Sequence, residues 1–244
     1  MRIYLSEETE PAVNAAMEEW LLREPGGVTE PAFMLYANRP AVLMGRNQNL
    51  RAECNPDYCR DNHITIMRRI SGGGTVFHDM GNLNLALVTP RQDYSPDAFA
   101  SLLTSLLAEL GVPEVTIDSS HSVFSQGLKL CGTAFALTSG GALMHGCVLV
   151  STDLDELRRA LTPIGEAPDE TSHGVPSRRV PVTRLADVIG DISCEDVAAL
   201  ALSQMMERHQ GTEALPLAAA DLEGNPNYQE YLAKFRDEAW NWRS

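Results

Sequence analysis

Apolar side chains recur every three or four residues in four stretches of the chain, which is the spacing of an amphipathic helix. The clearest stretch is bounded by Ser95-Pro96, a cap followed by a first-turn proline, and by Gly111. The others begin near Pro11, Asp153 and Ser193. The stripes are Val13, Ala16, Met17, Trp20 and Leu21; Phe99, Leu102, Leu103, Leu106, Leu107 and Leu110; Leu154, Leu157 and Leu161; and Val197, Leu200, Ala201 and Met205. These faces are expected to belong to the core.

Short apolar runs between the helices predict strands at residues 33–36, 41–44, 64–67 and 83–87. Two longer strands are expected between Leu128 and Val150, around the turn Thr138-Ser139-Gly140-Gly141. The strands at 33–36 and 41–44 are expected to form a hairpin, because only four residues separate them. The chain thus combines strands with helices, and we interpret it as an α/β domain.

Three consecutive glycines, Gly72, Gly73 and Gly74, lie between two predicted strands. Glycines let the backbone approach a ligand and expose amide N–H groups, which can form a nest for an anion. Arg69 adds a forked donor beside them. This combination favours capture of a phosphate or carboxylate over a plain flexible loop. No Gly-Lys-Ser/Thr follows the glycines, so the motif is not a P-loop.

Charge and composition narrow the choice of partners. The net charge of −14 over 244 residues argues against nucleic acid, which requires a broad basic face. No leader-like start and no long apolar run are visible, so we expect a cytoplasmic protein without a membrane partner. The five scattered cysteines are typical of reduced thiols and predict neither a disulfide framework nor a metal site.

Residues 68–84 resemble the signature of the lipoate-protein ligase A family, Arg-Arg-x-x-Gly-Gly-Gly-x-Val-x-His-Asp-x-Gly-Asn-x-Asn, at every fixed position. Further similar segments follow in the family's order along the chain. They are Gly45-Arg46-Asn47-Gln48-Asn49, Glu53-Cys54-Asn55, Lys129-Leu130-Cys131-Gly132-Thr133-Ala134 and His145-Gly146, with weaker matches at Asn14, Glu18, Glu19, Ser177-Arg178-Arg179-Val180, Val182-Thr183 and Trp240-Asn241.

The resemblance implies a fold and an activity. We expect an α/β (α+β) fold with a mixed central sheet and flanking helices, as in biotin/lipoate ligase catalytic domains. One such domain would occupy residues 1–244, helical from about residue 190, without the accessory C-terminal domain of many family members. The activity would be ATP-dependent ligation of lipoate, through lipoyl-adenylate, with Mg²⁺ as the counter-ion of the triphosphate. The partners would be lipoyl domains of 2-oxo acid dehydrogenases or the glycine cleavage H protein, with an accessory ligase subunit as a further possibility.

The family pattern also assigns roles to residues of this chain. Lys129 would bridge the lipoate carboxylate and the nucleotide phosphate. The nucleotide would be held by Arg69 and by the backbone of Gly74, Thr75, Val76 and Phe77. The pocket would be shaped by Gly45, Gly72, Gly73, Asn82 and Asn84, and the glycine turn by His78. His145 is expected to be a hydrogen-bonded structural residue.

One departure from the family bears on adenylation. Members usually carry Asn-Asp eight residues before the lysine, an amide and a carboxylate that could serve Mg²⁺ or phosphate. This chain has His121-Ser122 there.

Two alternatives remain open. One is a transferase of octanoyl or lipoyl groups between carrier proteins, with a cysteine as the nucleophile. Strand alternation predicts that Cys131 shares a face with Lys129, and Cys147 with His145. The other is a non-catalytic binder of lipoate or nucleotide. The preference between lipoate and octanoate also stays open.

Overall fold

The computed structural model describes residues 1–164 and 174–242. Its strands are β1 Arg2–Leu5, β2 Ala32–Ala37, β3 Ala41–Met44, β4 Thr65–Arg68, β5 Val76–His78, β6 Asn82–Pro90, β7 Val115–Ile117, β8 Val123–Ser125, β9 Leu128–Leu137, β10 Gly141–Leu149 and β11 Ala214–Pro216. Its helices are α1 Pro11–Leu22, α2 Leu50–Glu53, α3 Pro56–Asp61, α4 Pro96–Glu109, α5 Leu154–Ala160, α6 Leu185–Ile189, α7 Cys194–Arg208, α8 Ala219–Leu222, α9 Pro226–Arg236 and α10 Glu238–Asn241, with a 3₁₀ turn at Arg91–Asp93.

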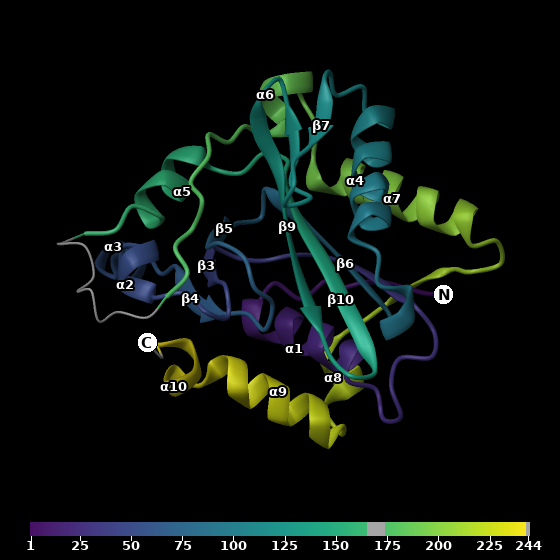
Figure 1. The fold of residues 1–244 in the computed structure, drawn as a ribbon. Helices are drawn as coiled ribbons and strands as arrows, with labels where there is room; N and C mark the ends of the chain where they lie inside the picture. Colours follow the sequence, from purple (N-terminus) through teal and green to yellow (C-terminus); the bar gives the residue numbers. More distant parts are fainter. Residues whose placement is uncertain (165–173, 243–244) are drawn as a thin grey trace.

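The strands form two sheets (Figure 1). The large sheet has the order β11-β1-β2-β6-β10-β9-β8-β7, and the small sheet has the order β4-β3-β5. β11, β1 and β2 are parallel to one another, whereas β2, β6, β10, β9, β8 and β7 pair antiparallel in turn. The expected mixed sheet with flanking helices is therefore confirmed.

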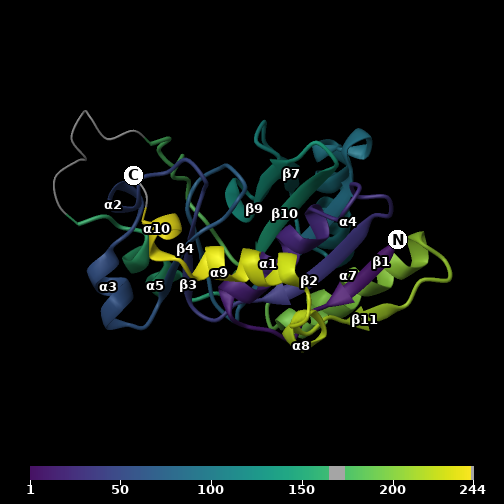
Figure 2. The same ribbon diagram turned by 90° about the horizontal axis from the view of Figure 1, so that it is seen from below.

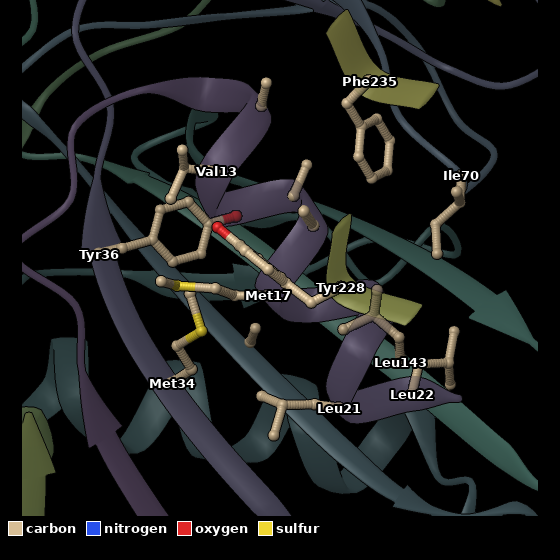
Figure 3. Close-up of a cluster of buried hydrophobic side chains, with 14 of the residues drawn as sticks. Val13, Met17, Leu21, Leu22, Met34, Tyr36, Ile70, Leu143, Tyr228 and Phe235 are labelled. Carbon is tan, nitrogen blue, oxygen red and sulfur yellow. The ribbon is translucent and has the colours of Figure 1, made fainter. Parts of the chain in front are cut away.

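The two faces of the large sheet pack against different helices. Along β2 and β6, residues alternate between a cluster with α1 and α9 and a cluster with α4 and α7. Figure 1 shows α1 beside α9, and α4 beside α7. Figure 3 shows side chains of α1 meeting those of the sheet and of α9, including Met17, Met34, Leu143 and Tyr228. At one edge of the α9 contact, Glu19 of α1 also pairs with Lys234.

The four predicted helices are present, with the ends that local chemistry indicated. Pro96 occupies the first turn of α4, and the Ser95 hydroxyl accepts a hydrogen bond from the amide of Ala98 at 3.3 Å. Ser193 and Asp196 form a reciprocal capping box at the start of α7. Local sequence thus suffices for helix starts, because the capping groups lie within a few residues of one another.

The expected hairpin between residues 33–36 and 41–44 is wrong. β2 belongs to the large sheet, whereas β3 pairs with β4 and β5 in the small sheet. At the crossing point, Asn38 is buried, and its amide is held by side chains of two distant elements, Asn14 of α1 and His78 of β5. Long-range polar contacts therefore separate two strands that sequence proximity would have paired.

The described residues after 190 form α7, β11, α8, α9 and α10, of which only α7 was predicted individually. The signal for α9 was available: the cap Asn225 and first-turn Pro226 precede Tyr228, Leu232 and Phe235 on one face. Figure 2 shows α10 next to β4, to which it returns the chain's C-terminal segment. Across the described ranges, 1–164 and 174–242, no helix has the length and apolarity that a bilayer crossing requires.

Candidate active site

The glycine turn, residues 70–75, connects β4 to β5 and lies against the loop at residues 45–49. Gly73 has a φ of 83°, a left-handed conformation that glycine adopts at little cost. A Cβ atom on Gly45 would collide with the carbonyl oxygen of Gly73. The absence of a side chain at position 45 therefore lets the two loops touch.

Arg69 organises this turn from inside. Its Nε donates to the Ser71 hydroxyl at 2.9 Å, Nη1 to the Leu43 carbonyl at 2.8 Å, and Nη2 to the carbonyls of Gly72 and Gly74 at 2.6 and 2.7 Å. Burial lowers the pKa of the guanidinium to about 10, so it remains charged at neutral pH. Arg69 borders a cavity, but these hydrogen bonds commit most of its donors to the protein's own backbone.

Arg68 fixes the neighbouring loop. Its Nη1 donates to the carbonyls of Gly45 and Gln48 at 3.1 and 2.7 Å. Its backbone amide donates to Asn241 Oδ1 at 2.8 Å, and Trp240 Nε1 donates to its carbonyl at 2.8 Å. The match to the family at Trp240-Asn241 is thus a contact that ties α10 to the base of the glycine turn.

Lys129 lies at the start of β9, on the other side of the site. Its backbone pairs with Pro181 and Thr183 at 3.0 Å each. A Cβ at Gly132 would stand 3.3 Å from both Cε and Nζ of Lys129, so the side chain lies folded across this glycine. Within the described residues the ammonium has no hydrogen-bond acceptor and no carboxylate within 4 Å. It is a partly buried charge without a close partner.

Two cavities meet at this ammonium. One, of about 330 Å³, lies between α1, β10 and the glycine turn. The other, of about 430 Å³, lies between β9, α5 and residues 177–182. We name them the first and second cavities. The residues that border both are Thr75, Val76, Lys129, Gly132, Cys147, Ser177, Arg178 and Val180.

The structure brings most of the predicted site residues together. Those that border the first cavity are Arg69, Gly73, Gly74, Thr75, Val76, His78, Asn84 and Lys129. Phe77 borders the second cavity. Gly45, Gly72 and Asn82 border neither. Asn82 is fully buried at the start of β6, and its side-chain amide has no hydrogen-bond partner among the described residues.

A buried polar network lines the first cavity. Tyr36 Oη donates to Glu18 Oε1 at 2.8 Å, and His145 Nδ1 lies 3.0 Å from Glu18 Oε2. His145 Nε2 lies 2.7 Å from the Ser71 hydroxyl, which also accepts from Arg69. Burial, and then the neighbouring Glu18 carboxylate, raises the pKa of Tyr36 well above its ordinary value. Both nitrogens of His145 are engaged in this network, whose Tyr36 was not predicted.

His78 is held in its neutral form. The Asn38 amide donates to its Nδ1 at 3.1 Å, so the ring proton lies on Nε2. Burial, together with the charges of Arg69 and His145, lowers the pKa of His78 to about 3. Nε2 is buried and has no hydrogen-bond partner in the part of the chain that the structure describes. His78 therefore adds an unpaired donor to the wall of the first cavity.

Residues 174–183 cross the glycine turn as a strap. The Ser177 hydroxyl accepts from the Thr75 amide at 2.9 Å and from Gln48 Nε2 at 2.8 Å. The Ser177 amide donates to Glu53 Oε1 at 2.9 Å. The Thr75 amide, predicted to hold nucleotide, is thus satisfied by the strap in this structure.

The loop between β7 and β8 adds a carboxylate that sequence analysis missed. Asp118 borders the first cavity, and its Oδ1 accepts from the Ser120 amide and hydroxyl and from the Ser122 amide, at 2.9, 2.6 and 3.1 Å. Burial raises the pKa of Asp118, but these hydrogen bonds and the charge of Lys129 outweigh it and lower the pKa below its ordinary value. The carboxylate is therefore ionised at neutral pH.

The expectation that Cys131 shares a face with Lys129 is wrong. Val123 pairs with Cys131 whereas Phe124 pairs with Lys129, so Leu130 is an extra residue in β9. Such a β-bulge breaks the alternation of side chains. Leu130 and Cys131 both enter the core beside α4, and burial raises the pKa of the Cys131 thiol well above its ordinary value. A buried, protonated thiol of this kind is a poor nucleophile.

The expectation that Cys147 and His145 share a face is confirmed, since both border the first cavity. Cys147 also pairs in register with Gly132, across which Lys129 folds. It is half-buried, and its thiol forms part of the wall that the two cavities share. Cys147 is therefore the cysteine with access to a ligand near Lys129.

Comparisons with known proteins agree with this arrangement. The model of the lipoyl protein ligase A/B catalytic domain matches residues 10–206. A lipoate-protein ligase A of Psychrobacter cryohalolentis is 29% identical over 249 residues, covering 100% of this chain and 72% of the relative. A lipoate-protein ligase 1 of Staphylococcus aureus is 30% identical over 238 residues, covering 96% and 70%. A relative in Schizosaccharomyces pombe is 34% identical over 184 residues, which are 75% of this chain and about half, 49%, of that protein.

Solved structures share the fold. A P. falciparum protein in complex with lipoate superposes with a TM-score of 0.81 at 20% identity, covering 100% of this chain and 74% of the other. A lipoate-protein ligase A bound with ATP gives a TM-score of 0.75 at 23% identity, covering 99% and 98%. The family match spans the glycine turn, both cavities and Lys129, and the chain therefore belongs to the lipoyl protein ligase A/B catalytic domain family.

Proposed function

We propose that the protein is a lipoate-protein ligase, which uses ATP to activate lipoate and then transfers the lipoyl group to a lysine of a carrier domain. The observation that carries this proposal is the ammonium of Lys129. It lies where two cavities meet, and none of the described residues neutralises it within ion-pair distance. An ammonium without a close anionic partner can bind one anion in the first cavity and another in the second.

In the first half-reaction, a lipoate carboxylate oxygen attacks the α-phosphorus of ATP, and pyrophosphate leaves. In this proposal Lys129 holds the carboxylate in the first cavity against the α-phosphate in the second, which is supported by its position at the border of both. Holding both anions lowers the entropic cost of their encounter and offsets their repulsion. The chain of hydrogen bonds from Glu18 through His145 to Ser71 would keep the cavity wall rigid around the acid.

The glycine turn would contribute backbone donors to the phosphates. Because the Thr75 amide now donates to Ser177, nucleotide binding there requires a phosphate oxygen to replace the Ser177 hydroxyl. Arg69 supports these donors indirectly, by fixing the carbonyls of Gly72 and Gly74. Mg²⁺, when bound, would neutralise the triphosphate.

In the second half-reaction, the amine of a carrier lysine attacks the acyl carbonyl of lipoyl-adenylate, and AMP leaves. The carriers that this implies are lipoyl domains of 2-oxo acid dehydrogenases or the glycine cleavage H protein. A structural neighbour is described as a bi-partite lipoate protein ligase with its E2 lipoyl domain, from Thermoplasma acidophilum. That description supports both a lipoyl-domain acceptor and a second polypeptide.

The decisive experiment supplies the purified chain with lipoate, ATP and Mg²⁺ and measures pyrophosphate, with and without an apo lipoyl domain. We expect pyrophosphate release that depends on lipoate, and a lipoyl mass increase on the acceptor lysine. Parallel assays with octanoate would define the preferred acyl chain. Lipoate binding without pyrophosphate release or acceptor modification would instead favour a non-catalytic binder.

Dependence on a second polypeptide is tested by separating the half-reactions. If an accessory subunit completes the adenylation site, the chain alone should form lipoyl-adenylate slowly but transfer the lipoyl group from supplied lipoyl-adenylate at full rate. Equal rates in the two assays would contradict this dependence.

A cysteine-dependent transferase is the second candidate, because Cys147 borders both cavities beside Lys129. In that reaction the thiolate would attack an acyl thioester of a carrier protein, releasing the carrier thiol, and the acyl group would then pass to the acceptor. Incubation with octanoyl-carrier protein, followed by intact-protein mass spectrometry, distinguishes the two candidates. An acyl adduct that is lost in Cys147→Ser would establish the transferase.

A further inference from the structure

The carboxylates around Lys129 differ in how fully they are used. Glu18 is the other acidic residue that borders the first cavity, and both its oxygens interact with Tyr36 or His145. Glu53 borders the second cavity, is buried, and accepts from the Ser177 amide. These two carboxylates are parts of the scaffold, since each one holds a neighbouring element in place.

The two carboxylate oxygens of Asp118 have different partners. Oδ1 takes all three hydrogen bonds from Ser120 and Ser122, which close the loop between β7 and β8. Among the described residues, Oδ2 has an ion pair with Arg178 Nη1 at the loose distance of 3.5 Å. The Arg178 side chain is 75% exposed, so this ion pair is weak. One oxygen of an ionised carboxylate therefore keeps its capacity to bind a cation.

The location of this oxygen suits the reaction. Asp118 borders the same cavity as Lys129, and the charge of Lys129 acts on it without a direct salt bridge. The cation that accompanies a nucleoside triphosphate must lie near the phosphates, and Mg²⁺ typically takes one or two carboxylates together with phosphate oxygens and water. No group of three or more His, Cys, Asp or Glu side chains in the described ranges is arranged as a separate metal site.

The departure from the family pattern at residues 121–122 bears on the role of the Asp118 carboxylate. The family resemblance leads us to expect Asn-Asp there, whereas this chain has His121-Ser122. His121 turns away, toward Asp97 at 3.1 Å, and the Ser122 amide donates to Asp118. The same loop thus supplies an oxygen anion four residues before position 122. Its donor set, a carboxylate with the hydroxyls of Ser120 and Ser122 nearby, fits a hard cation such as Mg²⁺.

We propose that Asp118 is the metal-binding residue of this chain, and that its Oδ2 binds the divalent cation of the triphosphate in place of the carboxylate missing at position 122. This inference rests on the proposed function, because it requires a triphosphate in the site. It adds a residue that the family signature does not assign.

The test measures nucleotide affinity rather than activity. Isothermal titration calorimetry would give the Kd for α,β-methylene-ATP, which cannot be cleaved at the reacting position, with Mg²⁺ and again with EDTA. Asp118→Asn keeps Oδ1 as the acceptor that closes the loop and replaces Oδ2, whose partner is the exposed Arg178. We expect the gain in affinity from Mg²⁺ to fall by about tenfold or more, as for other losses at metal sites. Metal-free affinity should stay equal or rise, because a negative charge near the phosphates has gone.

Two variants distinguish metal binding by Asp118 from a general effect of removing a nearby charge or of losing its ion pair with Arg178. Asp97→Asn removes an equally charged side chain that contacts the same loop through His121, and it should leave the Mg²⁺ gain unchanged. Arg178→Gln removes the loose partner of Asp118 and should also leave the gain intact. Retention of the full gain in Asp118→Asn would overturn the inference, as would an equal loss in Arg178→Gln. Failure of the unaltered chain to bind the analogue under either condition would contradict the proposed function itself, and the inference with it.

Discussion

Arg69 and Lys129 both border the first cavity, but their charged groups are used in opposite ways. Arg69 belongs to the most recognisable motif of the sequence, and its guanidinium makes four hydrogen bonds within the turn and to β3. Lys129 belongs to a weaker motif, and its ammonium has no close partner within the described residues. One cation therefore builds the site, whereas the other is available to a ligand.

This difference shows that a strong sequence motif can mark either the scaffold of a site or the residues that bind its ligand. The arginines and the glycine turn belong together because buried carbonyls of the turn, such as those of Gly72 and Gly74, must find hydrogen-bond donors. A residue that binds a transient ligand needs only one charge in one place. A specific sequence signature can therefore mark the scaffold of a site more clearly than the residue that performs the chemistry.

The largest expected effect is on activity. Lys129→Ala should lower lipoate-dependent pyrophosphate release by about 100-fold or more, because a preorganised charge acts on the reacting oxygens. Its free energy of unfolding should change by less than about 0.5 kcal/mol, since the ammonium has no hydrogen bond or ion pair with any described residue. The matched control is Arg91→Ala, which removes an exposed cation away from both cavities. Unchanged pyrophosphate release in Lys129→Ala would show that this residue has no part in the mechanism. The distinction between a structural Arg69 and a ligand-binding Lys129 would then be wrong.

The next effect is on stability. Arg69→Ala should lower the free energy of unfolding, measured in urea, by about 3 kcal/mol or more, because it leaves several buried carbonyls unpaired. Nucleotide binding should weaken as a consequence of the disordered turn. The opposite result, wild-type stability with a loss of nucleotide affinity alone, would make Arg69 a direct phosphate ligand.

The third prediction concerns the pH dependence of stability. The unfolded chain protonates His78 at about pH 6.5, whereas the folded chain does so only near pH 3. A depressed folded pKa in a base means that stability is complete above about pH 6.5 and declines as the pH falls toward 3. Between pH 7 and pH 5 this group should cost the protein about 2 kcal/mol.

His78→Gln isolates that contribution, because glutamine does not titrate. The free energy of unfolding of the variant should fall less than that of the wild type between pH 7 and pH 5, by about the same 2 kcal/mol. Parallel pH profiles for the two proteins would show that His78 is protonated normally in the folded state. The donor that we assign to its Nε2 would then be wrong.

The smallest expected effect belongs to Cys147→Ser. Serine keeps the size of the side chain, and the ligation mechanism gives the thiol no chemical step, so ATP-dependent lipoylation should change by less than about twofold, well under 1 kcal/mol. Cys131→Ser serves as the comparison: it should also keep activity, but it should lose stability because it places a hydroxyl in the core beside α4. Loss of lipoylation in the Cys147 variant alone would favour the transferase.

Features that depend on local interactions were predicted correctly, whereas features that depend on pairing with other elements were not. Helix starts at Pro11, Ser95 and Ser193 were predictable because caps and apolar stripes are local. The hairpin at residues 33–44 was wrong because distant side chains hold Asn38 between two sheets. The predicted face of Cys131 was wrong because simple strand alternation ignores a bulge: Leu130 is an extra residue where β9 pairs with β8.

The sequence alone determined four helices, the central strands and the position of the glycine turn, and it singled out Lys129 as a candidate, because propensity, capping and family pattern are written in consecutive residues. The tertiary structure decided which donors are used and which are free. In the folded chain, Arg69 donates to carbonyls of its own turn, whereas Lys129 lies between the two cavities. Asp118 borders the first of these cavities. The physical reason is that hydrogen-bond satisfaction and burial depend on neighbours far away in the chain, and these neighbours exist only once the sheets have assembled.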